Sequence, residues 1–393
     1  MCAVGSPFFF PNTPSSMAPE PSSGNPATDP VRILAWGART LVVAAGLIAA
    51  WMLHGCGPSS PGSPSGATAP AAAQESPLHF IHDWIPEPEH GGYYAAQLRG
   101  IWKEEGVEVD VLVGGPNSEI EKRVALDPWG LGIVRGDAVF VAVERGLPVV
   151  AVNSYFQHDP QGVMVREDSP VRSFADLEDR DLAMQIGGTW LQYLQRKYGL
   201  RKIRVRPITG NVANFVKDPD WIMQAYPTSE PYYALREGVA SRVLQISASG
   251  FDPYRVIIAN KALVAKHPEL VAKFSRGAYR GWQSYFRDPE PVHAHLKRIS
   301  PSMEPGGMRF SYVKMHELRL VEGEPAKGES MGAVDLPRWE ELGRILVDLG
   351  VVRKSLPVAE VVTDAFTPKA LGLDAALPAP YWTNAPVERA TSP

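Results

Sequence analysis

Apolar and polar positions change period repeatedly from residue 78 onward. Residues 107–113, Val-Glu-Val-Asp-Val-Leu-Val, alternate with a period of two, which predicts a strand. Just before them, apolar residues recur at i, i+4, i+7 and i+8 and predict a helix over residues 93–105. Strand and helix patterns then alternate as far as residue 259, and the chain beyond is mostly helical. This order indicates an α/β fold built from parallel β-α-β units.

The pattern predicts two series of elements. Strands are expected at 78–81, 107–113, 131–134, 148–155, 182–186, 203–205, 221–226, 243–246 and 256–259. Helices are expected at 93–105, from 118 on (where Ser118 and Glu121 have the spacing of a capping box), and at 137–145, 173–177, 187–199, 211–217, 228–238, 268–286, 290–299, 308–321 and 337–349.

The elements group into two α/β units, with the second inserted in the first. Crossovers near residues 169 and 252 divide them, so that residues 77–169 and 253–352 form the first domain and residues 170–252 form the second. Strand ends and helix starts from both units would line a cleft between them, which is a favoured place for a small ligand.

The amino-terminal part has a different composition. Residues 1–30 are rich in Pro, Ser, Asn and Gly and are expected to be disordered. In residues 31–55, Arg32 and Arg39 stand before an apolar run, which is typical of an export signal. That run would span only ~21 Å at ~1.5 Å per residue, less than the ~30 Å of a bilayer core. The folded body is therefore expected outside the cytoplasmic membrane.

The apolar run ends at Leu53-His54-Gly55-Cys56, which resembles a bacterial lipobox. The resemblance implies that Cys56 is lipidated and becomes the first mature residue, although His54 replaces the usual small or aliphatic residue. An uncleaved membrane anchor is the alternative. Residues 56–76 are rich in Gly, Pro, Ser and Ala and predict a flexible tether, and residues 370–393 predict a Pro- and Ala-rich tail.

Composition and charge narrow the function classes. The net charge of −4 gives no reason to expect a nucleic-acid partner. Both cysteines, Cys2 and Cys56, precede the folded body, so neither a disulfide framework nor a cysteine-based metal site is expected there. The nine histidines are scattered, and the chain has no Gly-x-Ser-x-Gly, P-loop or His-Glu-x-x-His motif. We therefore expect no metal, no cofactor and no enzyme activity.

The most unusual stretch is residues 83–94, between the first strand and the first helix. Pro86 and Pro88 exclude regular structure, and Gly91 and Gly92 leave the helix start bare, so that another molecule could approach the backbone. Trp84 follows the strand directly and offers a stacking surface. The stretch is interpreted as a wall of a ligand cleft, and a rigid loop with Trp84 as a core plug is the rival interpretation.

Similar strand–glycine–helix junctions occur later in the chain. Gly-Gly pairs before predicted helices offer free backbone N–H groups to a ligand, although tight turns explain them equally well. Glu230, between Ser229 and Pro231, places a carboxylate at a helix start, where it either contacts a ligand or favours the helix dipole. The candidate ligand-binding residues are Asp83, Trp84, Tyr93, Gly114, Gly115, Asn117, Gly187, Gly188, Thr189, Trp190, Tyr226 and Glu230.

Several motifs between residues 78 and 352 resemble the solute-binding proteins of ABC transporters, in the branch that binds thiamine pyrimidines, sulfonates and nitrate. The motifs are Asp83-Trp-Ile-Pro-Glu-Pro-Glu-His-Gly-Gly92, Gly114-Gly115, Gly146-Leu-Pro-Val-Val150 with Pro160-Gln-Gly-Val-Met164, and Thr228-Ser-Glu-Pro231 with Gly250-Phe-Asp-Pro-Tyr254.

The resemblance implies a two-domain periplasmic-binding-protein fold of type II with the ligand at the hinge. It also implies a small-molecule solute, best matched by a thiamine pyrimidine precursor, and delivery to an ABC permease and its ATPase. The alternatives are an alkylsulfonate, nitrate or carboxylate solute, or a pyrimidine-processing enzyme on the same fold. Fungal pyrimidine synthases of this fold carry a cysteine cluster that the body of this chain lacks.

Overall fold

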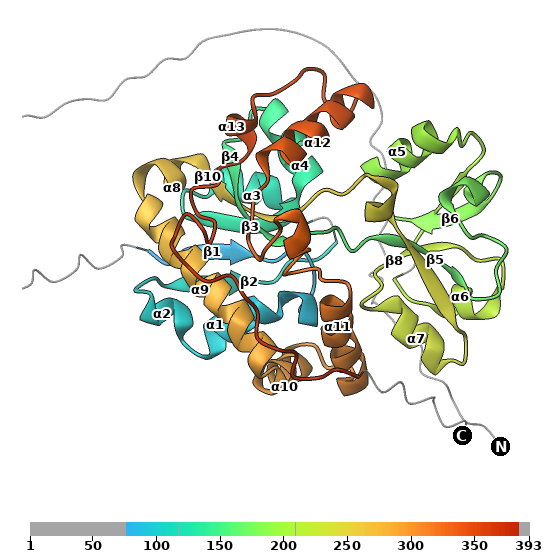
Figure 1. Ribbon diagram of the computed structural model, residues 1–393, viewed down its shortest axis with the longest axis horizontal. Helices are drawn as coiled ribbons and strands as arrows, with labels where there is room; N and C mark the ends of the chain where they lie inside the picture. Colours follow the sequence, from blue (N-terminus) through green and yellow to red (C-terminus); the bar gives the residue numbers. More distant parts are fainter. Residues whose placement is uncertain (1–75, 117, 209, 385–393) are drawn as a thin grey trace, which may run out of the picture. The chain divides into compact units, whose positions relative to one another are not determined.

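The computed structural model describes residues 76–116, 118–208 and 210–384, which include two five-stranded sheets (Figure 1). The first sheet has the order β2-β1-β3-β10-β4 and the second has the order β7-β6-β8-β5-β9. The strands are β1 (Leu78–Ile81), β2 (Val109–Leu112), β3 (Gly130–Arg135), β4 (Val149–Phe156), β5 (Gly162–Arg166), β6 (Asp181–Met184), β7 (Arg204–Pro207), β8 (Met223–Ala225), β9 (Ser241–Gln245) and β10 (Arg255–Asn260).

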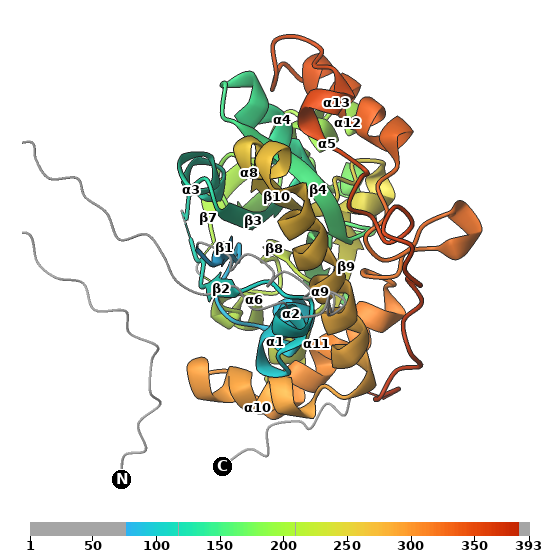
Figure 2. The same ribbon diagram turned by 90° about the vertical axis from the view of Figure 1, so that its left-hand side faces the viewer.

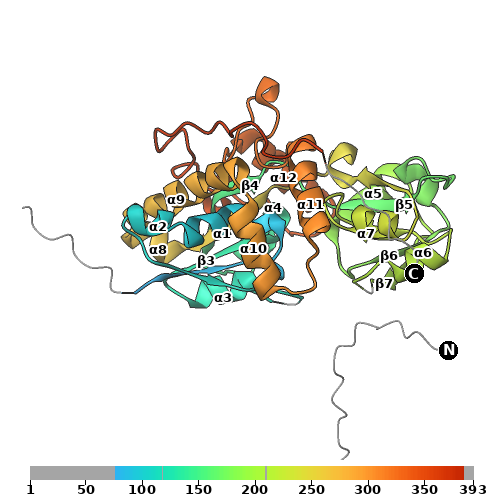
Figure 3. The same cartoon turned by 90° about the horizontal axis from the view of Figure 1, so that it is seen from below.

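Helices cover both faces of the first sheet. Figures 2 and 3 show α9 with α1 and α2 on one face and α3 on the other. The helices are α1 (Gly91–Leu98), α2 (Ile101–Glu104), α3 (Ile120–Leu126), α4 (Gly136–Glu144), α5 (Thr189–Tyr198), α6 (Ala213–Lys217), α7 (Glu230–Arg236), α8 (Lys261–Lys266), α9 (Pro268–Arg287), α10 (Glu290–Ile299), α11 (Pro305–Glu317), α12 (Leu336–Asp348) and α13 (Val358–Val361), with 3₁₀ turns η1 (Pro88–His90), η2 (Phe174–Leu177), η3 (Ile246–Ser249) and η4 (Pro325–Lys327).

The sheets are mixed, so the expectation of purely parallel units is wrong in part. β1 runs parallel to β2 and β3, but β10 runs antiparallel to both β3 and β4. In the second sheet β6 runs parallel to β7 and β8, while β5 runs antiparallel to β8 and β9. The antiparallel strands, β5 and β10, are the first strands that the chain forms after each crossover.

The crossovers fall between β4 and β5 and between β9 and β10. The sequence pattern missed β5, and because β5 pairs with β8 and β9, the second sheet begins before the predicted crossover near residue 169. After β9 the chain returns to the first sheet, where β10 lies between β3 and β4. The division into domains 77–169 with 253–352 and 170–252 stays a prediction.

Two local expectations about helices are wrong. The predicted helix over residues 93–105 is broken at Gly100, whose φ of 67° is left-handed, so that α1 and α2 are separate. The capping box expected at Ser118 does not form, because Glu119 takes a φ of 45° and the Ser118 hydroxyl donates to the Gly115 carbonyl instead. A capping box is present at Ser173 and Asp176, at the start of η2.

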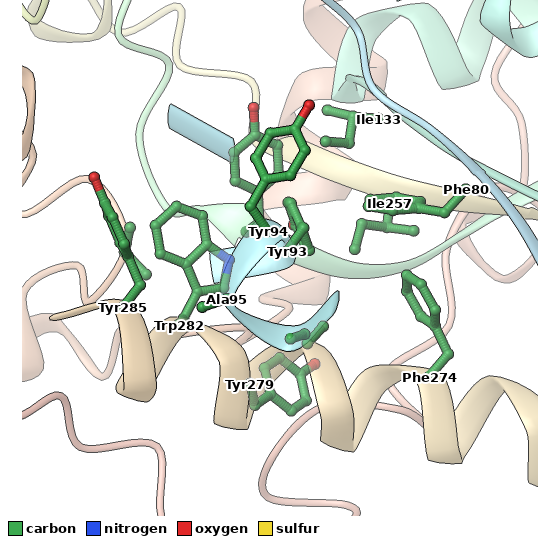
Figure 4. Packing of buried hydrophobic residues seen from close by; sticks show 14 of the residues in the cluster. Phe80, Tyr93, Tyr94, Ala95, Ile133, Ile257, Phe274, Tyr279, Trp282 and Tyr285 are labelled. Atoms are coloured by element: carbon green, nitrogen blue, oxygen red, sulfur yellow. The ribbon is translucent and has the colours of Figure 1, made fainter. Parts of the chain in front are cut away.

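Gly91 and Gly92 serve helix packing, which corrects the interpretation of a bare helix start open to a ligand. Both residues are buried against α9, and a Cβ at Gly91 would lie 2.4 Å from the ring of Tyr285. A Cβ on Gly281 of α9 would lie 2.2 Å from the Gly92 carbonyl oxygen. Figure 4 shows Trp282 and Tyr285 rising from α9 toward the segment that carries Tyr93. The glycines therefore let two helices approach closely.

The last described residues lie along the first sheet's helices. The Tyr279 hydroxyl donates to the Phe366 carbonyl at 2.8 Å, and Gln283 donates to the Asp374 carbonyl at 2.9 Å. Trp382 packs at 5.2 Å from the Tyr312 ring. Residues 370–384 are thus fixed to α9 and α11 by contacts that the Pro- and Ala-rich composition did not reveal.

The predicted segments 1–30 and 31–55, nearly all of 56–76 and the lipidation site Cys56 lie outside the described residues. Within the described part of the chain, none of the helices combines the length and apolar character needed to cross a membrane.

Candidate functional site

Asp83, just after β1, is held by two side chains, one near it in the sequence and one far away. His90 of η1 contacts its Oδ1 through Nε2 at 2.9 Å, and Arg255 at the start of β10 donates to its Oδ2 at 2.6 Å. Burial alone raises the pKa of Asp83, but the His90 hydrogen bond and the Arg255 charge outweigh burial and lower that pKa. Asp83 is therefore an ionised anchor that joins the loop after β1 to the first residue of β10.

Arg255 starts a polar chain that crosses from the first sheet to the second. Its Nε lies 3.8 Å from Asp159 Oδ1, and Asp159 Oδ2 accepts from Gln161 Nε2 at 3.2 Å. Gln161 Oε1 accepts from Gln224 Nε2 at 3.0 Å, and Gln224 Oε1 accepts from the Gln185 backbone N–H at 3.0 Å. Asp159, Gln161 and Arg255 are all buried, so this chain of contacts forms an ordered polar floor between the two sheets.

A pocket of about 100 Å³ lies where this polar floor meets the start of α5. It is lined by Arg135, Gln161, Gln185, Ile186, Gly187, Gly188, Trp190 and Gln224. The volume suits a compact polar group better than a whole fused-ring ligand, because ligand pockets usually measure ~300–1,000 Å³. The first N–H groups of a helix have no partner within the helix, so the start of α5 adds donors to this pocket.

Arg135 in this pocket is already neutralised. Its Nε and Nη2 donate to both oxygens of Asp137 at 2.9 and 3.0 Å. Burial raises the pKa of Asp137, but the charge of Arg135 and its hydrogen bond, together with that of Thr189, lower it overall. Because Asp137 is in the first turn of α4 beside the first sheet and Thr189 begins α5 beside the second, this contact also joins the two sides.

Acidic side chains gather beside Asp83. Burial, together with the charges of Glu89 and Asp83, raises the pKa of Glu87. Burial also raises the pKa of Glu89, which is only 4% exposed. Glu230 accepts from the Tyr226 backbone N–H at 2.7 Å, and burial raises its pKa to about 7. This acidic cluster therefore holds acceptors and protonatable carboxyl groups.

The structure places several predicted residues in the acidic cluster beside Asp83 or in the pocket at α5. Asp83 and Glu230 lie in the acidic cluster, and the guanidinium of Arg255 lies 5.5 Å from the centre of the Tyr226 ring. Gly187, Gly188 and Trp190 line the pocket, and Thr189 is next to Asp137. Trp84, at 40% exposure beside Ile85, presents an apolar surface after β1.

Other predicted residues have a different role. Tyr93 is fully buried in the same core as Tyr94, at 4.8 Å from Phe80, rather than on an open surface. Gly114 allows close backbone contact, because a Cβ there would lie 1.9 Å from the His82 carbonyl oxygen. Gly115 has open space around it, and Asn117 lies outside the described residues.

The sequence interpretation missed Arg135, Asp159, Gln161, Gln224 and Arg255. Arg135 ends β3 and Arg255 begins β10. Both arginines could have been found from the sequence, because each is a charged residue at one end of a mostly apolar strand. The glutamines gave no such signal, since Gln161 and Gln224 meet only through the pairing of β5 with β8.

A second pocket, of about 350 Å³, lies at the two crossovers and is lined partly by Gln157, Tyr254 and Glu329. Next to it His158 contacts Asp252 at 2.7 Å and Glu329 at 3.0 Å, and the crossovers are thereby tied together. Burial lowers the pKa of His158, but the Asp252 hydrogen bond and the two carboxylates outweigh burial and raise it. No group of His, Cys, Asp and Glu among the described residues is arranged to hold a metal ion.

Comparison with known proteins gives relatives of two kinds. The chain is 23% identical to the riboflavin-binding protein RibY of Chloroflexus aurantiacus, over 83% of this chain and 97% of that protein. It is 21% identical to a 4-amino-5-hydroxymethyl-2-methylpyrimidine phosphate synthase of Legionella pneumophila, over 75% of this chain and 93% of that protein. A binding protein and an enzyme are thus similar to it at comparable levels.

The fold matches that of solved periplasmic binding proteins. The alkanesulfonate-binding protein SsuA of Xanthomonas axonopodis, solved with bound MOPS, superposes with a TM-score of 0.56 at 14% identity, over 75% of this chain and all of that one. The two mixed sheets joined by two crossovers are therefore a periplasmic-binding-protein fold, as expected from the sequence. The model of the family described as NMT1/THI5 like matches residues 87–292, and the chain belongs to that family.

Proposed function

We propose that this protein is an extracytoplasmic receptor that captures a small neutral heterocyclic solute between its two sheets and delivers it to an ABC permease and its ATPase. The observation that carries the proposal is the polar floor between the two sheets, with the pocket beside it. Side chains from both sheets meet there in a polar floor of hydrogen bonds and one ion pair, from Asp83 to the Gln185 backbone. Such a floor offers fixed donors and acceptors to a ligand bound between the two sides.

The charge of the cleft favours a neutral solute over sulfonate, nitrate or carboxylate. Arg135 is paired with Asp137, and Arg255 is paired with Asp83. Asp159, Glu87, Glu89 and Glu230 add further carboxyl groups near these pairs. Both arginines therefore already have a carboxylate partner, and an anion would gain no unpaired positive charge from either of them.

Two classes of ring suit this site. A thiamine pyrimidine precursor would place its exocyclic amine at Glu230 and its ring on an aromatic side chain, for which Trp84 and Tyr226 are the candidates. A flavin is the second class, because a relative over nearly its whole length is named a riboflavin-binding protein. Both solutes are flat nitrogen heterocycles, and both are consistent with the neutral character of the cleft.

Binding is proposed rather than catalysis. Several relatives are named pyrimidine phosphate synthases, so an enzyme on this fold is the competing function. The chain has no cysteine after Cys56. Both carboxylate oxygens of Asp83 already have partners, in His90 and Arg255. These features support a receptor with an ordered binding surface.

The proposed place of action is outside the cytoplasmic membrane, with acyl chains on Cys56 as the anchor and residues 56–76 as the tether. Replacement of Cys56 by serine should release the protein from membranes. Unchanged retention would favour an uncleaved anchor.

The experiment for the proposed function is a thermal-shift screen of four solute classes: aminopyrimidines, flavins, alkanesulfonates and small anions, followed by calorimetry on each hit. A solute at 100 times its Kd should add about 2.7 kcal/mol of stability. The proposal expects a neutral heterocycle to bind and Trp84→Ala and Glu230→Ala to weaken it. Binding by anions alone, or a heterocycle whose affinity survives both substitutions, would refute the proposed site.

A further inference from the structure

The two glutamines in the polar floor have a fixed orientation. At one end of the chain of contacts, Gln224 Oε1 meets the backbone N–H of Gln185, which can only donate. The Gln224 amide nitrogen must therefore face Gln161, and Gln161 must turn its oxygen toward Gln224. The Gln161 nitrogen then donates to Asp159. Because a backbone N–H sets this polarity, it holds whatever the protonation state of Asp159.

This polarity decides what the pocket can offer. The NH₂ groups of Gln161 and Gln224 each donate one hydrogen bond within the floor and have a second hydrogen left for a ligand. Arg135 donates hydrogen bonds from Nε and Nη2 to Asp137 and keeps its Nη1 hydrogens as donors for a ligand. The N–H groups that begin α5 complete the set. The described lining of this 100 Å³ pocket is accordingly rich in donors without a net positive charge.

We propose that Gln161 and Gln224 are specificity-determining residues, which make this pocket select the acceptor edge of a neutral ring, such as the carbonyl oxygens of a cyclic imide, over an amine. The inference rests on the proposed function, because it assigns one end of the solute within that cleft. An amine in the pocket would face N–H groups and leave both partners unsatisfied, which is the strongest basis for rejecting a ligand.

The polarity can be reversed by one substitution. In Gln224→Glu, one carboxylate oxygen still accepts from the Gln185 N–H, but the other faces Gln161 Oε1, so the Gln161 amide must flip or lose its partner. A flipped Gln161 would aim its oxygen at Asp159. Either way the pocket loses donors and gains an acceptor.

Gln185→Glu is a matched control. The floor uses only the Gln185 backbone, and its exposed side chain lines the same pocket, so this change adds the same charge without interrupting the contacts. Gln224→Met serves as a second variant, because it removes the amide without adding charge. Thermal melts of all three variants report whether each one folds.

The test measures, by calorimetry on the full-length protein, the affinities of riboflavin, which carries a cyclic imide, and of 4-amino-5-hydroxymethyl-2-methylpyrimidine. The proposal expects wild-type protein to bind riboflavin, with a loss of about tenfold or more in Gln224→Glu and Gln224→Met and a clearly smaller loss in Gln185→Glu. Equal losses in Gln224→Glu and Gln185→Glu, or a wild-type protein that binds only the aminopyrimidine, would overturn the selection while leaving the receptor function intact. Wild-type protein that binds neither compound would overturn both.

Discussion

Gly92 tests whether the glycines after the Asp83 loop serve helix packing. In the structure a Cβ on Gly92 would lie 2.3 Å from Cγ and Cδ2 of Trp282. Carbon atoms in ordinary contact are roughly 3.5 Å apart or more, so Gly92→Ala demands a shift of about 1 Å. Trp282 is 1% exposed and packs against Phe286 and Tyr155, so the indole has no free direction in which to move.

The expected cost of Gly92→Ala is that of an overpacked core, about 1–3 kcal/mol of unfolding free energy. The melting temperature should fall by several degrees, since ~2–4 °C per kcal/mol is usual for domains of 150–250 residues. Urea unfolding should show a lower midpoint with an unchanged slope. Both measurements use purified protein without solute, so they report on packing alone.

Gly115→Ala is the matched control, because a Cβ there meets no atom within 4 Å. It should melt within about 1 °C of the wild-type protein, as surface substitutions usually do. If Gly92→Ala melted like Gly115→Ala, the close approach of α1 and α9 would be wrong. The interpretation of Gly91 and Gly92 as a surface for a ligand would then return.

Two further predictions concern pH. The pKa of Glu230 is raised to about 7, so the folded protein binds a proton at Glu230 more tightly than the unfolded chain does. Protonated Glu230 therefore contributes stability at low pH, and this contribution is lost as pH rises from about 4.5 through 7. Glu230→Gln should make the melting temperature less dependent on pH between about 4.5 and 7. An unchanged dependence would mean that the Glu230 carboxyl is solvent-exposed. The pKa of His158 is also raised, so its contribution is complete below about 6.5 and is lost at higher pH. His158→Asn should lower the melting temperature at pH 5.5 more than at pH 8.5, and an equal loss at both pH values would contradict the raised pKa of His158.

The periodicity of the chain predicted most of its elements because those elements are local. β1 occupies the predicted residues, and α10 does as well, because each has a clear apolar face between turn residues. β5 was missed because it is a five-residue run whose strand character depends on pairing with β8 and β9. Strand direction was missed for the same reason, because the spacing of apolar residues in one segment does not show which strand it pairs with.

The site was only partly predictable. Asp83 was found because it follows the first predicted strand, and Glu230 because it stands between Ser229 and Pro231 at a helix start. Gly91 and Gly92 were given the wrong role because their partners, Trp282 and Tyr285, are almost two hundred residues away in the chain. Arg255 was missed although it contacts Asp83, because 172 residues separate the two. Long-range partners, rather than residue types, decide which polar groups are free for a ligand.

Hydrogen exchange with and without the best solute from the screen shows directly whether the solute lies between the two sheets. A solute held between the two sheets should protect backbone amides on both sides at once, in residues 83–90 and 157–161 and in residues 185–190 and 224–230. Protection confined to one sheet, or to residues 327–337 beside the second pocket, would contradict binding in the cleft.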